Sequence, residues 1–259
     1  MMLKDKVAVV YGAGGGIGGA VARAFALEGA RVFLTGRRLA SVQAVAKDLE
    51  GAEAAEVDAL DERAIDSHLD SVVAKAGRVD ISFNAVGFPN ATIVGVPLTE
   101  LAAEHFSQPL TEYGLSYFLT ARLAARRMVA QESGVIMTVT ALHSRTGLPL
   151  VGGYGPAMAA KEALTRDLSA ELAQYGVRVV GLRPQGMPET RTIKDAFKPR
   201  AKATGLTWDQ WLDLLAARTH PRRLMTLEEM ASLAAFIASD KASGLTGTTV
   251  NLTMGSLDD

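Results

Sequence analysis

The chain has 259 residues, of which 48% are hydrophobic and 21% charged, the composition of an ordinary globular protein. Its 27 basic and 28 acidic side chains leave a net charge of -1, which argues against a nucleic-acid or anionic-membrane partner, because both need a positive surface. The chain has no cysteine, so disulfides, thiolate catalysis and cysteine-ligated zinc are excluded. We expect no metal site, no membrane span and a cytoplasmic location.

Short apolar runs alternate with stretches of helical periodicity. The expected strands are 7–11, 31–35, 54–57, 80–83, 135–139, 177–182 and 248–252. The helices expected between them are 18–27, 39–49, 62–75, about 110–130 and 154–174. Continuous apolar strands joined by helical crossovers indicate a parallel sheet covered on both faces. The predicted fold class is therefore α/β, a Rossmann-type doubly wound sheet of about seven strands, in a single domain over 1–259.

The least regular segment is 185–223, which contains Pro188, Pro199 and Pro221 as well as both tryptophans, Trp208 and Trp211. Loops beyond the carboxyl ends of the strands form the ligand crevice in open α/β sheets. We interpret this segment as a substrate lid. The alternative is a packing segment with two core tryptophans.

A glycine-rich loop follows the first expected strand and opens the first helix. Glycines let a backbone turn tightly and approach a diphosphate, whose negative charge then lies at the helix N-terminus. The position between strand and helix makes this run more specific than the glycines alone. The residues predicted to bind the diphosphate of a dinucleotide are Gly12, Gly14, Gly16, Ile17 and Gly18.

The second expected strand ends in Thr35-Gly36-Arg37-Arg38. A site that prefers NAD would place a carboxylate here for the ribose 2′-hydroxyl, whereas guanidinium groups suit a 2′-phosphate. Gly36 stands where that acid is expected, so Arg37 and Arg38 predict NADP(H) over NAD(H). The alternative is a solvated arginine pair at a helix start.

Three further residues follow the next two strands. Asp58, after the third strand, is placed to accept a hydrogen bond from an adenine amino group. Asn84 and Gly87, after the fourth strand, are placed to pack behind the adenosine ribose. Each alone is a plausible turn residue, and together they extend the predicted cofactor site.

Together these residues resemble the short-chain dehydrogenase/reductase family over essentially the whole chain. The glycine loop resembles the family's T-G-x-x-x-G-I-G, with Tyr11 in place of threonine, and 84–87 is similar to its N-N-A-G with the second asparagine lost. The resemblance implies a nicotinamide cofactor, a small-molecule substrate, and a homotetramer or homodimer joined through the helices over 115–128 and 157–172.

The resemblance also implies a catalytic set of Asn, Ser, Tyr and Lys, in which the tyrosine is the acid/base. Tyr154 matches the tyrosine. Met158 stands at the lysine position, Ala141 at the serine position and Tyr113 at the asparagine position. Tyr154 is therefore expected to act as the acid/base with other neighbours than the family's lysine, serine and asparagine.

Lys161 lies seven residues after Tyr154, a spacing that resembles the Tyr-x6-Lys of the enoyl reductase branch. In both branches the lysine lies nineteen residues before the strand that begins here at Val177, and counting back from Val177 returns Met158. Lys161 is one helical turn further on, and its side chain leans back toward the N-terminus. We predict Lys161 as the second catalytic residue, as a substitute lysine or in an enoyl-type arrangement.

Other donors follow the fifth and sixth strands. Thr140, His143 and Ser144 are candidates to replace the missing serine, and His143 is also a candidate acid or base near neutral pH. Thr190 stands one residue from the place of the threonine in the family's P-G-x-x-x-T, and is predicted to reach the nicotinamide amide.

Three functions are consistent with these residues. The first is an NADP(H)-dependent oxidoreductase that acts on a carbonyl or alcohol, with Tyr154 as acid/base. The second is a non-catalytic NAD(P)-binding protein, a pseudoenzyme or sensor, which the altered catalytic set suggests. The third is an enoyl reductase-like enzyme that uses Tyr154 and Lys161.

Overall fold

The computed structural model describes residues 1–89, 93–203 and 205–258. Its centre is a seven-stranded sheet in the order β3-β2-β1-β4-β5-β6-β7, in which all neighbouring strands are parallel. The strands are β1 Val7–Tyr11, β2 Arg31–Gly36, β3 Glu53–Glu56, β4 Ile81–Asn84, β5 Gly134–Val139, β6 Val177–Pro184 and β7 Thr248–Leu252. This order confirms the predicted Rossmann-type doubly wound α/β fold, and its direction reverses between β1 and β4, where such sheets bind ligands.

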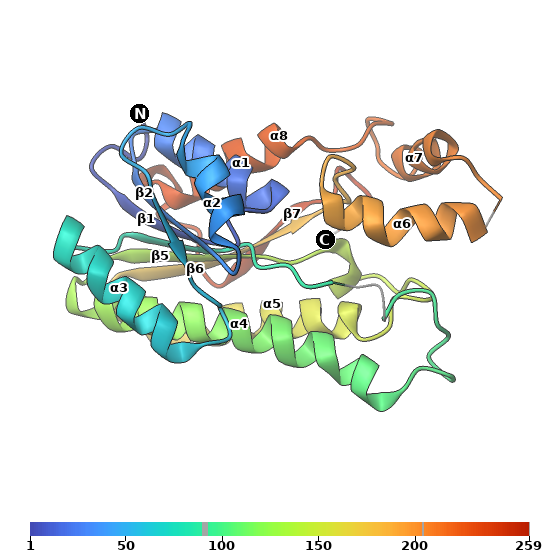
Figure 1. Cartoon of the computed structure of the whole chain (residues 1–259), viewed down its shortest axis with the longest axis horizontal. Coiled ribbons are helices and arrows are strands. Elements are labelled where there is room, and N and C mark those ends of the chain that lie inside the picture. The colour runs from blue at the N-terminus through green and yellow to red at the C-terminus, as the bar shows by residue number, and fades with distance from the viewer. Residues whose placement is uncertain (90–92, 204, 259) are drawn as a thin grey trace.

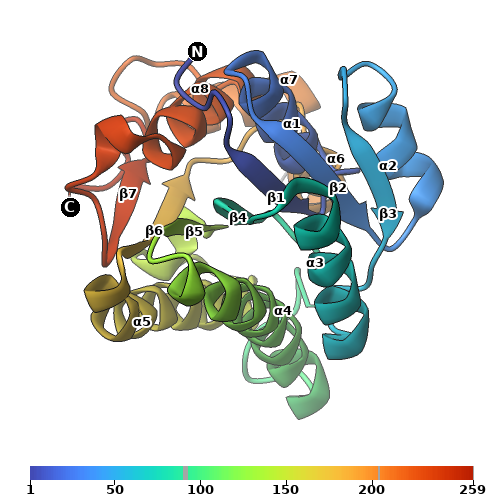
Figure 2. The same ribbon diagram turned by 90° about the vertical axis from the view of Figure 1, so that its left-hand side faces the viewer.

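Helices cover both faces of the sheet (Figure 2). They are α1 Gly16–Leu27, α2 Leu39–Ala46, α3 Glu62–Ala76, α4 Ala103–Ala130, α5 Tyr154–Leu172, α6 Arg191–Ala203, α7 Trp208–Ala216 and α8 Leu227–Ala238. The helices α1, α2 and α8 share one buried apolar cluster with the sheet, and α3, α4 and α5 share another. Figure 1 shows α6 and α7 beyond one end of the sheet.

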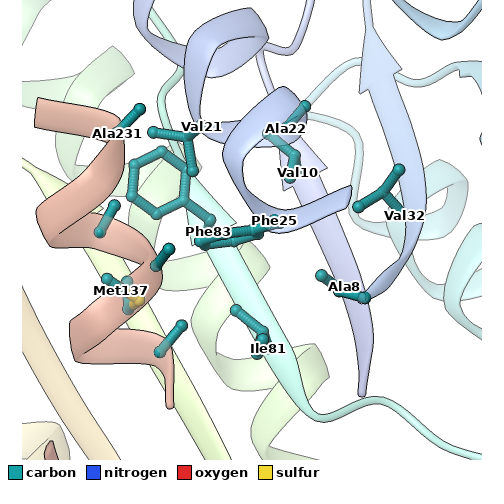
Figure 3. Packing of buried hydrophobic residues seen from close by; sticks show 14 of the residues in the cluster. Ala8, Val10, Val21, Ala22, Phe25, Val32, Ile81, Phe83, Met137 and Ala231 are labelled. Atoms are coloured by element: carbon teal, nitrogen blue, oxygen red, sulfur yellow. The ribbon is translucent and has the colours of Figure 1, made fainter. Parts of the chain in front are cut away.

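The central strands β1 and β4 are buried on both sides, and β1 is apolar along its whole length. On the α1 face, the Phe25 ring meets the Phe83 ring edge to face at 6.0 Å, beside Val10 and Met137 (Figure 3). Burying each such side chain contributes about 1.5–3 kcal/mol. This packing fixes α1, and with it the glycine loop, over the carboxyl end of β1.

The helix α4 begins at Ala103, earlier than the predicted start near Leu110. The predicted start excludes Pro109, a residue type that cannot donate to the helix ladder and disfavours a helix interior. In the structure Pro109 is buried inside α4, and Gly153 lies against its ring and against the Phe106 carbonyl oxygen. Tertiary packing of this first part of α4 therefore outweighs the local preference.

The segment predicted as a lid contains α6 and α7, which meet through the rings of Phe197 and Trp211 at 6.0 Å. Trp211 is buried and Trp208 is half-buried. The segment therefore has both features considered above: it lies beyond β6, and its tryptophans pack against other residues. The lid role of 185–223 and the single-domain organisation stay predictions. Within the described ranges, no helix has the length and apolar character needed to cross a bilayer.

Candidate active site

The glycine loop turns sharply between β1 and α1. Gly12 has a φ of 76°, and a Cβ atom there would lie 2.6 Å from the Ala85 carbonyl oxygen. A Cβ atom at Gly18 would overlap the Gly12 carbonyl oxygen. Both positions therefore require glycine. Gly15 caps α1 without a side-chain hydrogen bond, and the first turn carries no acidic residue, which leaves the first N–H groups as donors for an anion.

Two exposed arginines, Arg37 and Arg38, follow β2, and Gly36 stands at the end of this strand, where a site that prefers NAD would place a carboxylate. The Arg37 guanidinium lies 5.5 Å from the centre of the Phe88 ring, a cation–π contact that orients it. Asp58, two residues after β3, accepts a hydrogen bond from the Leu60 N–H at 3.0 Å. The residues present therefore fit a dinucleotide, with N–H donors at α1 for its diphosphate and two cations after β2.

The other predicted cofactor residues lie at the same edge, with different surroundings. Asn84 is buried, and its amide donates to the Ser116 carbonyl and to the Thr120 hydroxyl at 3.2 and 3.0 Å, which ties β4 to α4. Gly87 is exposed beyond it. The Thr190 hydroxyl donates to the Met187 carbonyl at 2.8 Å, and its methyl group lies against Gly16. The structure thus brings the β6–α6 connection onto the glycine loop.

Tyr154 is the first residue of α5 and lies at the edge of a small apolar cluster, here called the Tyr154 cluster. Its buried members are Phe88, Tyr113, Ala141, Ala157 and Met158. The Tyr154 ring meets the Tyr113 ring at 5.6 Å and the His143 ring at 5.3 Å, both edge to face. Tyr113, Ala141 and Met158 stand at three of the four positions that the resemblance implies as catalytic. They surround Tyr154 with two apolar side chains and one aromatic ring.

These surroundings change the acidity of Tyr154. Burial raises the pKa of Tyr154 above its usual value near 10, and the neighbouring Tyr113 raises this pKa further. The hydroxyl therefore stays protonated at physiological pH. In that state it can donate a hydrogen bond to a substrate oxygen, and the phenolate that would accept a proton from an alcohol is scarcely populated.

Lys161 is buried between α5, α4 and β5, with 1% of its surface exposed. Its ammonium donates to the Val139 carbonyl at 2.7 Å and lies 5.9 and 5.6 Å from the ring centres of Tyr113 and Tyr117. Burial lowers the pKa of Lys161 to about 7. The structure thus connects Lys161 to Tyr154 through the Tyr113 ring, and its catalytic role stays a prediction.

The buried ammonium predicts a pH-dependent stability. Lys161 titrates near 10.4 when unfolded and near 7 when folded, so between these values the unfolded chain binds more protons and stability rises with pH. We expect Lys161→Met to be more stable relative to wild type at pH 6.5 than at pH 9.5, by on the order of 3 kcal/mol. Urea unfolding at both values measures this difference, with the exposed Lys47→Met as control. Equal differences at the two pH values would contradict it.

A buried ion pair lies behind the loop that follows β5. The Arg183 guanidinium donates to Glu162 at 2.8 and 2.9 Å, and both side chains are about 95% buried. The hydroxyls of Thr140 and Ser144 donate to the same carboxylate at 3.0 and 2.6 Å. Burial alone would raise the pKa of Glu162, and the hydrogen bonds from Arg183 and Ser144 outweigh it and lower that pKa. Two of the three candidate donors of this loop therefore serve a carboxylate that sequence reasoning missed.

A groove of about 650 Å³ lies beside this loop, open to solvent. Its walls are the segment 97–99, Phe106 of α4, the loop 143–152 and the first turns of α5. We call it the α5 groove. His143 lies on its wall and also contacts the Tyr154 ring, so it stands between the groove and the Tyr154 cluster.

A family model described as enoyl-(acyl carrier protein) reductase matches residues 12–256. The uncharacterized oxidoreductase YxjF of Bacillus subtilis is 29% identical over 258 residues, and the match covers 98% of each chain. An NAD+-bound xylitol dehydrogenase is 26% identical, with a TM-score of 0.88 and coverage of 96% of this chain and 98% of that one.

The actinorhodin polyketide ketoreductase with NADPH shares the fold, with a TM-score of 0.88 at 24% identity over 96% of this chain and 97% of that one. The solved structures that share this fold thus include one with NADPH and one with NAD+. The family model spans nearly the whole sheet, from the glycine loop to the residues after β7. The chain belongs to the short-chain dehydrogenase/reductase family of oxidoreductases.

Proposed function

We propose that this chain is an NADP(H)-dependent oxidoreductase that interconverts a carbonyl and an alcohol on a small molecule, with Tyr154 as the acid/base. The observation that carries the proposal is the placement of Tyr154. Tyr154 lies at the carboxyl end of the sheet, and its ring meets the Tyr113 ring. The Tyr113 ring in turn meets the Phe88 ring, which contacts the guanidinium of Arg37, the proposed cofactor-binding residue.

When bound, NADPH supplies the hydride, and one proton from the medium completes the reduction. The arginine pair after β2 binds the cofactor's 2′-phosphate, and the N–H groups at the start of α1 bind its diphosphate. Tyr154 donates its hydroxyl proton to the substrate oxygen. Because the Tyr154 cluster keeps this hydroxyl protonated, the populated state is the one from which carbonyl reduction begins.

The NADP(H) preference gives a direct test. Arg37→Ala is expected to weaken NADPH binding about 10- to 100-fold, because it removes one charge-assisted hydrogen bond, and to leave NADH binding nearly unchanged. Calorimetric titration with both nucleotides measures this, and the exposed Arg63→Ala on α3 serves as control. Equal losses for the two nucleotides, or tighter NADH binding by the wild type, would contradict the preference.

A second candidate is a non-catalytic NAD(P)-binding protein, and the observation that favours it is the apolar character of Ala141 and Met158 beside Tyr154. A panel of aldehydes, ketones and alcohols, followed by NADPH absorbance, separates the two functions. Reproducible NADPH consumption with any carbonyl supports the reductase. NADPH binding without consumption across the panel favours the binding protein.

We also propose a homodimer or homotetramer in the cytoplasm. The outer surface of α4 exposes Leu115 and Phe118, and that of α5 exposes Ala159 and Ala160. Small and apolar residues on neighbouring helices allow close packing against a second copy.

A further inference from the structure

The Tyr154 ring has an inner and an outer neighbour. On the inner side, Tyr113 and Met158 are almost completely buried, with 5% and 1% of their surfaces exposed. These two side chains fill the positions where the family places an asparagine and a lysine. After Tyr154 has given up its proton, it therefore faces Met158, which has no ionisable group, at the position of the family's lysine.

On the outer side stands His143, in a single turn of 3-10 helix, Leu142–Ser144, after β5. It is half-buried, its ring meets the Tyr154 ring at 5.3 Å, and it lines the solvent-open α5 groove. Gly155 makes this approach possible, because a Cβ atom there would lie 3.0 Å from the His143 carbonyl oxygen. His143 is thus a titratable side chain that contacts Tyr154 and also lines the open α5 groove.

The loop that carries His143 is held from behind. Its next residue, Ser144, donates to Glu162 at 2.6 Å, and Glu162 is paired with Arg183 at 2.8 Å in the interior. A buried, hydrogen-bonded ion pair rigidifies the groups that it joins. The position of His143 against Tyr154 therefore follows from fixed parts of the fold.

We propose that His143 returns the proton to Tyr154 after each carbonyl reduction, an inference that rests on the proposed function. The Tyr154 O–H bond breaks as its proton passes to the substrate oxygen. An N–H bond of the His143 imidazolium then breaks, and that proton restores the Tyr154 hydroxyl directly or through one water. The neutral imidazole takes one proton from the water of the α5 groove, so each turnover consumes one proton from the medium.

Other ionisable groups face this pair from each neighbouring element. Tyr113 approaches from α4, with Lys161 behind its ring, and the Glu162–Arg183 pair lies behind Ser144. Among the described residues that line the α5 groove, the ionisable ones are His143 and Arg145. Imidazole is the side chain that ordinarily exchanges protons between pH 5 and 8, so His143 suits this transfer.

The test is His143→Ala with the carbonyl substrate found in the NADPH screen. We expect kcat to fall about 100-fold while KM and the NADPH affinity stay close to wild type, because the lost group moves a proton and binds neither substrate. Free imidazole at tens of millimolar should restore much of the rate, since the groove is open to solvent. His105→Ala, at an exposed position of α4, is the matched control.

A second measurement needs no turnover. Proton NMR resolves the ring signals of the four histidines, and their comparison with His143→Ala assigns His143. We expect Tyr154→Phe to shift the His143 titration midpoint and to leave that of His105 unchanged, because the His143 ring touches Tyr154.

The outcomes separate this inference from the proposed function. A wild-type kcat in His143→Ala overturns the proton-return role alone. A loss of rate that imidazole does not restore has the same meaning. So does a His143 titration midpoint that is the same in Tyr154→Phe as in wild type. A wild-type protein that binds NADPH and reduces none of the panel overturns the proposed function and this inference together.

Discussion

Tyr154→Phe is expected to lower kcat for NADPH-dependent carbonyl reduction by about 100-fold or more, the usual effect of removing a positioned donor to a developing oxyanion. Phenylalanine keeps the ring, so its contacts with Tyr113 and His143 are retained and only the hydroxyl is lost. Steady-state rates with saturating NADPH measure the effect. Calorimetry should show NADPH affinity within twofold of wild type, because the hydroxyl acts on the substrate.

Tyr175→Phe is the matched control, because Tyr175 is 42% exposed and lies at the other end of α5, in the turn before β6. This variant should keep the wild-type rate. If Tyr154→Phe also keeps it, Tyr154 does not take part in the reaction, and the proposed mechanism is wrong even though the cofactor binds.

The second large effect is on stability. Arg183→Met is expected to lower the free energy of unfolding by about 3–5 kcal/mol, because it leaves Glu162 buried without its charged partner. The lowered pKa of Glu162 means that the pair stabilises the fold above the usual glutamate pKa near 4.3, and that this contribution is lost as pH falls through the folded value. Urea unfolding at pH 7 measures the loss.

Two further variants make that result specific. The double variant Glu162→Leu/Arg183→Met removes both charges and should recover most of the stability, since a buried pair replaced by apolar residues is often neutral. Disrupting the exposed pair of Arg223 and Glu229 by Arg223→Ala should leave the free energy of unfolding close to that of wild type, because water screens exposed charges. A single Arg183→Met loss as small as the surface one would show that the buried pair does not hold the loop.

Much of the fold follows from local sequence patterns. The bounds of β1 and β7 agree with the predicted ones. For β1 the reason is a continuous apolar run that ends at a glycine, the pattern of a short buried strand. The predicted start of α4 was wrong: the helix extends through Pro109, which is buried and packs against Gly153. The helices α6 and α7 were not predicted as separate elements within the irregular lid segment.

The candidate site was predictable where one residue type suits one backbone geometry. Gly12 and Gly18 were found because a tight turn under a helix N-terminus requires glycine. Counting along the chain also placed Tyr113, Ala141 and Met158 around Tyr154, and the structure brings all of them into one cluster.

Contacts between distant residues were not predictable. Glu162 and Arg183 are 21 residues apart, and the packing of α5 on β6 brings them together. The available signal was a pair of opposite charges, Glu162 on α5 and Arg183 on β6, at positions that face the core. Neither residue was singled out from the sequence. The Arg37 contact with Phe88 likewise depends on how β2 and β4 flank β1.

The most direct test of the account is transfer of deuterium from NADPH labelled at nicotinamide C4 to a carbonyl substrate, followed by mass spectrometry of the product. We predict that wild-type protein forms an alcohol with one deuterium on the former carbonyl carbon, and that Tyr154→Phe forms about 100-fold less per unit time. Tight NADPH binding with no deuterated alcohol from any carbonyl tested would contradict the account.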